Sequence, residues 1–450
     1  MAEPLFQKKP LYYLSGALAL ALVGLVNPWV MPQWEQWGLL PAVPPQFMHA
    51  NDLKIGIPLS LDILLGLYAG IVMFHPKPWK QLFRESVGLN ACLLVALFLL
   101  QLSSNVILPG KFRFFRLALM LLQMLMMAKL LYLIAVKPAN GKPASGRVRN
   151  LSTLVFGVVM VLGVMESGAM FLVDTHRFNG TLASRAWFMR HWELNAEGYR
   201  DVDHDPKQVA KRKKVVVLGD SFVAGHGIAN PADRFSDRLG SLLGPSFEVF
   251  NLGVGGSDLR DGYDRLLQFP HEIDILVYSY YPNDIEQDGE RGGLVLQRAK
   301  SYDDIPAWLR YVVRRSYLLN YLYWRLPHPH ELTDYKGYVK QCYATPSVLS
   351  QHLQVMDSLA SFADRKGARF ATVVFPFLED AAQSEFATQP ALERFRQLGL
   401  PVLDVRSWML NRPALDFIVN QNDPHPNEYL HGLVADSLHR LMVDSAWLKP

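Results

Sequence analysis

The sequence predicts an α/β protein in two parts: a bundle of about five transmembrane helices over residues 1–173, then a domain built on a parallel β-sheet. Two observations predict this. The whole chain is 50% hydrophobic, and the long apolar runs are concentrated before Val173. Beyond residue 174, short β-rich runs alternate with helical patterns, which is typical of parallel strands joined by crossover helices.

Five apolar stretches approach the roughly 20 residues that a helix needs to cross a bilayer. They lie near residues 11–31, 55–74, 87–108, 114–136 and 151–173. The second is the weakest, because it contains Pro58 and Asp62. Further spans follow the first one, and no small-residue cleavage site ends it, so we expect a retained helix and not a cleaved signal peptide.

Basic residues in the loops predict the orientation of these spans. Lys8 and Lys9 precede the first span, and a basic loop at 137–150 separates the fourth from the fifth. Both favour a cytoplasmic N-terminus, and an odd number of spans then places the C-terminal domain outside. Basic residues at 111–116 argue for the opposite orientation but are outnumbered. We therefore expect a bacterial inner (plasma) membrane protein with a periplasmic or extracellular domain.

The net charge and the cysteine content limit the kinds of partner and site that the chain is expected to have. The net charge is only +4, and the basic residues cluster beside apolar runs, which indicates a membrane and not nucleic acid. Cys92 and Cys342 fall in different parts of the chain, so neither a disulfide nor a metal site is expected from them. Within the predicted spans, Lys129 is expected to snorkel towards the interface. Glu166 is expected either to have a structural role or to pair with another span or a partner membrane protein.

The predicted C-terminal domain covers residues 214–450, after a connector at 174–213. Its predicted strands and helices alternate along the chain: strands at 215–218, 248–252, 273–278, 370–375 and 401–405, and helices at 233–243, 258–267, 348–366 and 426–442. An insertion at 286–345 is rich in aromatic and basic residues. It could form a lid, a sugar-stacking wall, an interfacial helix on the membrane, or a helical insertion that packs on the domain.

Four short motifs follow the predicted strands, at the sheet edge where open α/β sheets bind ligands. They are Gly219-Asp220-Ser221, Gly253-Val254-Gly255-Gly256, Tyr281-Pro282-Asn283-Asp284 and Asp423-Pro424-His425. A serine alcohol needs an adjacent base and donors for the developing negative charge before it becomes an effective nucleophile. The motifs supply each of these groups, so the sequence predicts acyl-transfer chemistry at this edge.

These motifs resemble the blocks of the SGNH (GDSL-type) hydrolase superfamily over about the last 250 residues. The resemblance implies a flavodoxin-like three-layer α/β/α domain, with Ser221 as nucleophile and His425 as base. It also implies an oxyanion hole made by Ser221, Gly256 and Asn283. The stretch 194–200 before the first strand is similar to that of envelope-associated members.

The sequence departs from the family pattern at two places. The usual Asp-x-x-His block would place its acid at position 422, which is Asn422, whereas Asp423 stands two residues before His425. This Asp-x-His spacing is similar to that of the alginate-type proteins that O-acetylate bacterial exopolysaccharides, and we assign Asp423 as the orienting carboxylate. Tyr281 occupies the position where the family usually has glycine, so the wall of the pocket is expected to differ.

Some residues have competing interpretations. His425 is preferred as the base over His226, His271, His352 and His431, because only His425 stands in an Asp-x-His-Pro-Asn context before a helix. His226, Tyr281 and Asp284 are candidates for substrate binding, and Asp220 is expected to stabilise the turn. The glycine-rich loop at 253–256 lacks the Lys-Ser/Thr of a phosphate-binding loop, so it is expected to present a backbone N–H.

The predicted function is a membrane-anchored serine esterase or O-acyltransferase acting, through an acyl-serine intermediate, on acyl esters of an envelope glycan or exopolysaccharide. The acyl group is expected to be acetyl. No cofactor and no metal are expected. The expected partners are the bilayer, the ester substrate and, for transfer, a membrane acyltransferase or polysaccharide-export protein. The alternatives are a lipid or small-ester esterase, and a non-catalytic glycan-binding subunit of an export complex.

Overall fold

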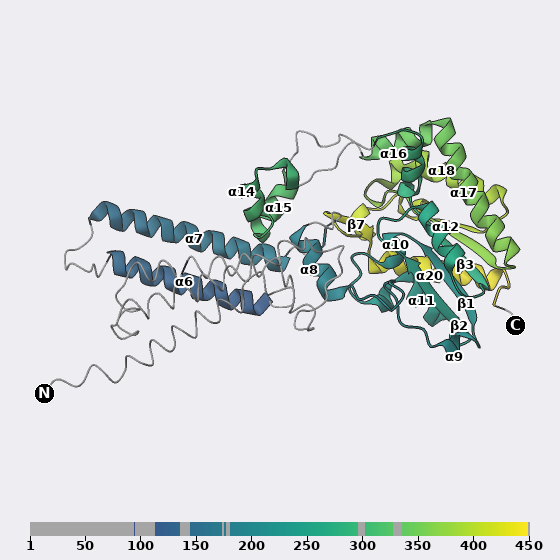
Figure 1. Ribbon diagram of the computed structural model, residues 1–450, viewed down its shortest axis with the longest axis horizontal. Coiled ribbons are helices and arrows are strands. Elements are labelled where there is room, and N and C mark those ends of the chain that lie inside the picture. Colours follow the sequence, from purple (N-terminus) through teal and green to yellow (C-terminus); the bar gives the residue numbers. More distant parts are fainter. Residues whose placement is uncertain are drawn as a thin grey trace, which may run out of the picture. The chain divides into compact units, whose positions relative to one another are not determined.

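The computed structural model describes residue 94 and residues 113–135, 145–172, 175–176, 181–295, 302–326 and 335–448. These residues form two compact units. The first contains α6 (Arg113–Ala135), α7 (Gly146–Leu172), most of α8 (Leu182–His191) and the segment 302–326. The second contains the β-sheet and the helices around it (Figure 1).

Helix α7 is the only described helix that is long and apolar enough to cross a membrane, over Gly146–Phe171. Only 11% of its most apolar window is buried against the protein. Helix α6 packs beside it and contributes a shorter apolar stretch, Met120–Tyr132. The predicted spans at 11–31, 55–74 and 87–108 lie outside the described residues, so the five-span bundle stays a prediction.

The segment 302–326 forms a helical hairpin in the first unit. It consists of a 3-10 turn η4 (Tyr302–Asp304), α14 (Ala307–Val313) and α15 (Tyr317–Arg325). Helix α15 packs on α7. The predicted insertion at 286–345 is therefore divided, because α13 (Glu286–Arg291) and α16 (Tyr335–Ala344) belong to the second unit. The predicted connector is divided in the same way, with 178–190 in the first unit and the residues from His191 onwards in the second.

The second unit is built on five parallel strands, which confirms the predicted sheet. The strands are β1 (Lys213–Gly219), β2 (Phe247–Gly253), β3 (Ile275–Tyr280), β4 (Arg369–Val374) and β5 (Val402–Asp404). Their order is β2-β1-β3-β4-β5, and each neighbouring pair is parallel. This is the flavodoxin-like order, which reverses direction at β1 and opens a ligand crevice beside it.

Both faces of the sheet are buried under helices. Successive side chains of a strand point to opposite faces, so each strand contributes to two cores. Val216 and Leu218 of β1 lie in one core cluster, whereas Val215 and Val217 lie in the other. The first cluster is covered by α12 (Leu259–Gln268), α16, α17 (Pro346–Arg365) and α18 (Glu385–Gln397). The second is covered by α11 (Phe235–Leu243), α19 (Arg406–Met409) and α20 (Glu428–Asp444). Figure 1 shows α17 and α18 side by side on one flank of the sheet.

Short elements after the strands shape the edge of the sheet. They include α10 (Ser221–Ala224), η2 (Pro231–Asp233), η3 (Pro282–Ile285), η5 (Leu378–Ser384) and η6 (Ala414–Asp416), while α9 (Pro206–Val209) precedes β1. A second, antiparallel pair of strands, β6 (Ile418–Asn420) and β7 (Asp423–Pro426), stands outside the main sheet. This hairpin was not predicted from the sequence.

Candidate active site

Ser221 stands at the turn between β1 and α10. Strand β1 is enclosed on both faces, and Asp220 caps the following helix by accepting a hydrogen bond from the Phe222 N–H at 2.8 Å. At Gly219 a side chain would not fit, because a Cβ there would lie 2.6 Å from Val223 Cγ2. The sharp turn and its tight packing therefore fix the position of the serine through the backbone.

The loop after Ser221 is held by a buried arginine. Arg200 donates hydrogen bonds to the carbonyl oxygens of Ala224 (3.1 Å), Gly225 (2.5 Å) and Ile228 (2.6 Å). The Arg234 guanidinium in turn donates to the Arg200 carbonyl oxygen. Burial, followed by the nearby positive charge of Arg234, lowers the pKa of Arg200 to about 9. This contact gives the predicted 194–200 stretch a structural role next to the nucleophile.

Strand β7 positions the other two candidate catalytic residues. Asp423 and His425 are two residues apart on it, and side chains at i and i+2 of a strand point to the same face. The short Asp-x-His spacing is therefore suited to a strand, in which it places both side chains together. Asp423 is fully buried, whereas 13% of the His425 side chain remains exposed.

The structure brings Ser221, His425 and Asp423 into a hydrogen-bonded series. His425 Nε2 lies 2.9 Å from Ser221 Oγ, and His425 Nδ1 lies 2.5 Å from Asp423 Oδ1. Both distances are within hydrogen-bonding range. With the proton on Nδ1 directed at the carboxylate, Nε2 is free to accept the serine proton.

The Asp423 carboxyl is held in its charged form. Burial by itself raises the pKa of Asp423, but His425 and His226 nearby and hydrogen bonds from His425 and Thr175 outweigh it, so that the pKa falls well below its ordinary value. A permanently ionised carboxylate is suited to hold the His425 imidazole in one tautomer and to stabilise the imidazolium that forms when a proton is taken up.

His226 is not in a position to line a substrate pocket. Only 3% of it is exposed, and its ring is stacked on that of His425, with centroids 4.0 Å apart and planes 3° from parallel. Its Nε2 lies 3.5 Å from Asp423 Oδ2, and its imidazole is hydrogen-bonded to the His176 backbone. Burial, followed by the proximity of His425, lowers the pKa of His226 to about 3. The neutral His226 ring thus packs against the face of the candidate base, His425.

Gly256 lies in a tight turn after β2. The Ser257 N–H donates to the Val254 carbonyl oxygen at 3.2 Å, and Gly256 has φ +76°, a conformation that favours glycine. Arg265 fixes the turn to the end of β1, because its guanidinium donates to both Ser257 Oγ and the Gly219 carbonyl oxygen at 3.0 Å. Among the hydrogen bonds of the described residues, none uses the Gly256 N–H, so this exposed donor is available to a ligand.

Asn283 follows β3 in the turn η3. Its side-chain Nδ2 donates to Asp220 Oδ2 at 3.4 Å. An amide nitrogen has two hydrogens, so one remains for a second acceptor. Burial raises the pKa of Asp220, while the hydrogen bonds it accepts from Phe222 and Asn283 act in the opposite direction. Asp220 therefore links the serine turn to the Asn283 amide, in addition to stabilising the turn as predicted.

The two other predicted substrate contacts are placed differently. Asp284 is only 3% exposed and accepts hydrogen bonds from the Tyr278 hydroxyl (2.8 Å) and the Tyr281 N–H (2.9 Å). Burial, followed by the charge of Asp220, raises the pKa of Asp284 well above its usual range. Its position indicates a structural role and not substrate contact. Tyr281 is half-buried and packs against Phe222, with ring centroids 4.3 Å apart.

The remaining histidines that competed with His425 lie away from Ser221. His352 is buried between Asp288 and the Tyr280 hydroxyl, at 3.0 and 3.1 Å. His431 Nδ1 accepts a hydrogen bond from the Phe235 N–H, and burial, followed by Arg234 nearby, lowers its pKa to about 3. His271 packs beside Phe250. None of the three is hydrogen-bonded to Ser221 in the described structure.

His226, Asp423 and His425 form the one group of described residues whose ligand atoms are close enough together to suggest a metal site. Their geometry does not suit one. The two imidazoles are stacked 3° from parallel, so their in-plane lone pairs cannot converge on a single ion. His425 also engages both Ser221 and Asp423. The arrangement fits a hydrogen-bonded catalytic series better than a set of metal ligands.

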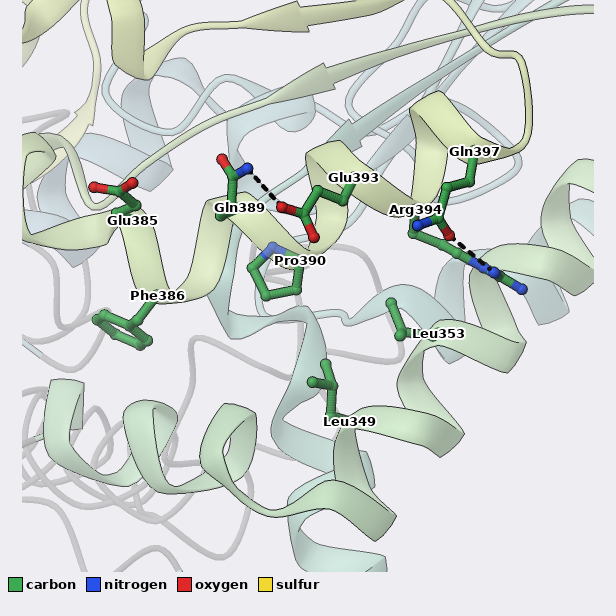
Figure 2. A pocket seen from close by; sticks show the side chains of 9 residues that line it. All are labelled: Leu349, Leu353, Glu385, Phe386, Gln389, Pro390, Glu393, Arg394 and Gln397. Atoms are coloured by element: carbon green, nitrogen blue, oxygen red, sulfur yellow. Dashed lines mark hydrogen bonds between the residues drawn. The ribbon is translucent and has the colours of Figure 1, made fainter.

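Two hollows elsewhere in the second unit are not lined by the candidate catalytic residues. One of about 400 Å³ lies between α17 and α18 and is shown in Figure 2. It is lined by apolar side chains such as Leu349, Leu353 and Phe386, and by polar pairs such as Gln389–Glu393, at 2.7 Å. None of the site residues predicted from the sequence borders it.

Among known proteins, the chain is similar to several solved structures. No model of a protein family and no curated protein sequence matches the chain. An acetyl xylan esterase is 13% identical and covers 51% of this chain and 98% of its own length, with a TM-score of 0.32. A lipase/acylhydrolase from Enterococcus faecalis is 16% identical, with coverages of 51% and 95% and a TM-score of 0.32.

A carbohydrate acetylesterase family member from Sinorhizobium meliloti is 14% identical and covers 53% of this chain and all of its own, again with a TM-score of 0.32. These similarities extend over about half of the chain and are at low identity. The function proposed below therefore rests on the geometry of this chain's own residues.

Proposed function

We propose that the chain is a serine esterase or O-acyltransferase in which Ser221, His425 and Asp423 form the catalytic triad. The observation that carries this proposal is the series of hydrogen bonds from Ser221 Oγ to His425 (2.9 Å) and from His425 to the buried Asp423 (2.5 Å). Ser221, at the end of β1, meets His425 and Asp423, both on β7, in the order that nucleophilic acyl transfer requires.

In the first step, His425 Nε2 takes the proton of Ser221 as Oγ attacks the ester carbonyl carbon. The carbonyl oxygen becomes negatively charged, and the N–H groups of Ser221 and Gly256 and the Asn283 amide are the donors we assign to it. His425 then protonates the departing alcohol, which leaves an acyl-Ser221. In the second step, His425 activates the acceptor hydroxyl, and collapse of the second tetrahedral intermediate frees the serine.

The acceptor decides between hydrolysis and transfer. Water gives an esterase, and a sugar hydroxyl gives an O-acyltransferase, with the same catalytic residues. We propose an acetyl ester of an envelope glycan or exopolysaccharide as substrate. The short Asp-x-His spacing, which is similar to that of alginate-type acetylation proteins, and the apolar helix α7, which suits an anchor in the bacterial inner membrane, support this choice.

This assignment places the second unit in the periplasm or outside the cell. For transfer, an acyl donor must reach that side, so a separate membrane acyltransferase or export protein is part of the proposal. The runner-up functions are a lipid or small-ester esterase and a glycan-binding subunit without turnover. The hydrogen-bonded triad favours turnover, since a binding subunit has no need of a base aligned with a serine.

The test is hydrolysis of p-nitrophenyl acetate by the full-length chain in lipid nanodiscs. We expect Ser221→Ala and His425→Ala each to lower kcat by about 10⁴-fold or more, because the nucleophile and the base act as one unit. Ser241→Ala is the matched control, since Ser241 is an exposed serine on α11 that bonds only within its own helix. We expect it to retain full activity.

A folded wild-type protein that turns over no faster than both variants would contradict the catalytic assignment and favour the glycan-binding subunit. If both variants lose activity, acetylated sugar oligomers identify the acceptor. Release of free acetate alone indicates an esterase, and acetate transferred to an added oligosaccharide, detected by mass, indicates a transferase.

A further inference from the structure

Glu166 lies near the C-terminal end of the candidate membrane helix α7. It lies six positions before the last residue of the helix, Leu172, which corresponds to about 9 Å along the axis. A carboxylate at that depth of a bilayer is costly unless it is paired or hydrogen-bonded. From the sequence alone, its partner could be another span, a partner membrane protein or a structural contact.

The structure shows the partner of Glu166 to be the N-terminus of α15. The carboxylate accepts hydrogen bonds from the Ser316 hydroxyl (2.7 Å), the Tyr317 N–H (2.7 Å) and the Leu318 N–H (2.9 Å). The first N–H groups of a helix have no partners within it, and the positive end of the helix dipole favours an anion there. The hydrogen-bond donors that the Glu166 carboxylate needs are thus supplied by a segment 150 residues further along the chain.

A second contact inside the same unit fixes the hairpin. Asn320 of α15 accepts a hydrogen bond from the Leu182 N–H at 3.0 Å, and it donates to the Tyr302 hydroxyl at 2.6 Å. Tyr317 packs with Met170 of α7 and Leu182 of α8 in a small buried core. The hairpin 302–326 is therefore built onto the end of α7 and does not form a separate module.

The outward side chains of the hairpin have the composition of a membrane interface. Trp308 is 70% exposed and Leu326 is 61% exposed, and Leu319 and Leu322 are also exposed. The whole segment contains seven aromatic residues, of which Tyr317 is buried, and four arginines, of which Arg315 is buried, against two aspartates. Aromatic and basic side chains are enriched where protein meets lipid headgroups, and apolar side chains beside them enter the upper acyl region.

We propose that the hairpin 302–326 lies in the lipid headgroup layer of the bilayer that α7 crosses, and that Glu166 is the residue that docks it there. The proposed occupant of its exposed face is an anionic phospholipid surface. This rests on the proposed membrane anchoring by α7. The chain passes from the second unit into the hairpin and back again, so the two units are connected through the insertion as well as through the segment after α7.

The experiment measures depth in the full-length chain. One cysteine at a time is introduced as Trp308→Cys, Val161→Cys or Val202→Cys, in a Cys92→Ser, Cys342→Ala background that removes both native thiols. Each variant is labelled with bimane and reconstituted in nanodiscs of phosphatidylcholine and phosphatidylglycerol. Val161 is 59% exposed in the middle of α7, and Val202 is 62% exposed in the second unit. Nitroxide is placed either on the lipid headgroup or at carbon 12 of the acyl chain.

We expect headgroup nitroxide to quench the label at 308 at least threefold more than the label at 202. The acyl nitroxide should quench the label at 161 most. If 161 is quenched and 308 behaves like 202, the hairpin proposal is wrong and the anchoring stands. If 161 is not quenched by the acyl nitroxide, α7 does not span, and both membrane proposals fail. Turnover of water-soluble ester in the same discs tests the chemistry independently.

The docking role of Glu166 is tested with Glu166→Gln, which replaces a charged acceptor by a neutral amide. We expect headgroup quenching at 308 to fall at least twofold and trypsin to cut the hairpin arginines faster, with ester turnover unchanged. Glu193→Gln, an exposed glutamate of the second unit, is the matched control. Equal quenching in Glu166→Gln and Glu193→Gln would overturn the docking role. Replacement of phosphatidylglycerol by phosphatidylcholine should weaken quenching at 308, and an equal signal would overturn the anionic preference.

Discussion

The two halves of the candidate triad are held in different ways. Ser221 stands on a turn between β1 and α10, and the strand before it is enclosed by core side chains on both faces. Asp423 and His425 stand on β7, one strand of a two-stranded hairpin outside the main sheet. The nucleophile is thus fixed by backbone packing, whereas the base is fixed by its side-chain neighbours.

This difference predicts how each half responds to substitution. Around the serine, the tight approach at Gly219 and the buried Arg200 leave the backbone little freedom. Around His425, the orientation depends on one carboxylate and one stacked ring. Removing those neighbours should therefore reduce catalysis while the fold is retained.

Among variants that keep Ser221 and His425, the largest effect is expected for Asp423→Asn. An amide placed at 2.5 Å from His425 Nδ1 would donate a hydrogen bond to it, which leaves the proton on Nε2 and prevents His425 from accepting the serine proton. We expect kcat for p-nitrophenyl acetate to fall by about 10⁴-fold. Near-ultraviolet circular dichroism should stay unchanged, because the substitution preserves shape.

Asp436→Asn provides the control for that variant, since Asp436 is an exposed carboxylate on α20. It should retain full activity. A loss of less than tenfold in Asp423→Asn would show that β7 holds His425 without help from the carboxylate, and the contrast between the two halves would disappear.

A smaller loss of kcat is expected for Asn283→Ala, which changes the Ser221 side of the site, next to the main sheet. Its amide donates to Asp220 and retains one hydrogen for the oxyanion. Removing a single oxyanion donor costs about 10²–10³ in kcat, and KM should hardly change, because the bond strengthens only in the transition state. Steady-state kinetics on the same ester measure both values.

The exposed Asn411 offers a matched asparagine for comparison, and Asn411→Ala should behave as wild type. If Asn283→Ala raised KM and left kcat intact, Asn283 would be a substrate-binding residue and not an oxyanion donor.

The fold of the second unit was predictable because parallel strands with both faces buried form short apolar runs. Predicted strand ends differ from the observed ends by no more than two residues, as for 273–278 against Ile275–Tyr280. Strand β7 was not predictable in this way. Its residues are Asp423-Pro424-His425-Pro426; the prolines favour an extended backbone, but they cannot donate to a ladder and they have low strand propensity, so the sequence did not indicate a paired strand.

The site was predictable to a similar extent. Motif spacing placed Ser221, Gly256, Asn283 and His425 at one sheet edge, because each follows a strand. The burial of His226 behind His425 was not predictable, since it depends on a tertiary stack. The division of the insertion between the two units was also not predictable, because it depends on contacts such as that between Glu166 and Ser316, which are 150 positions apart. No local pattern records such a contact.

The smallest effect is expected at His226, the ring behind the base. His226→Phe keeps the stack on His425 and should retain kcat within about threefold, whereas His226→Ala removes it and should lose about tenfold, because His425 gains freedom to leave its alignment. Since burial and the neighbouring His425 lower the pKa of His226 to about 3, its ring stays neutral down to that pH. The acidic limb of the pH profile of kcat/KM should therefore be the same in wild type and His226→Phe. A shift of that limb would show that His226 itself titrates with the reaction, and the base would then be held by a charge and not by packing.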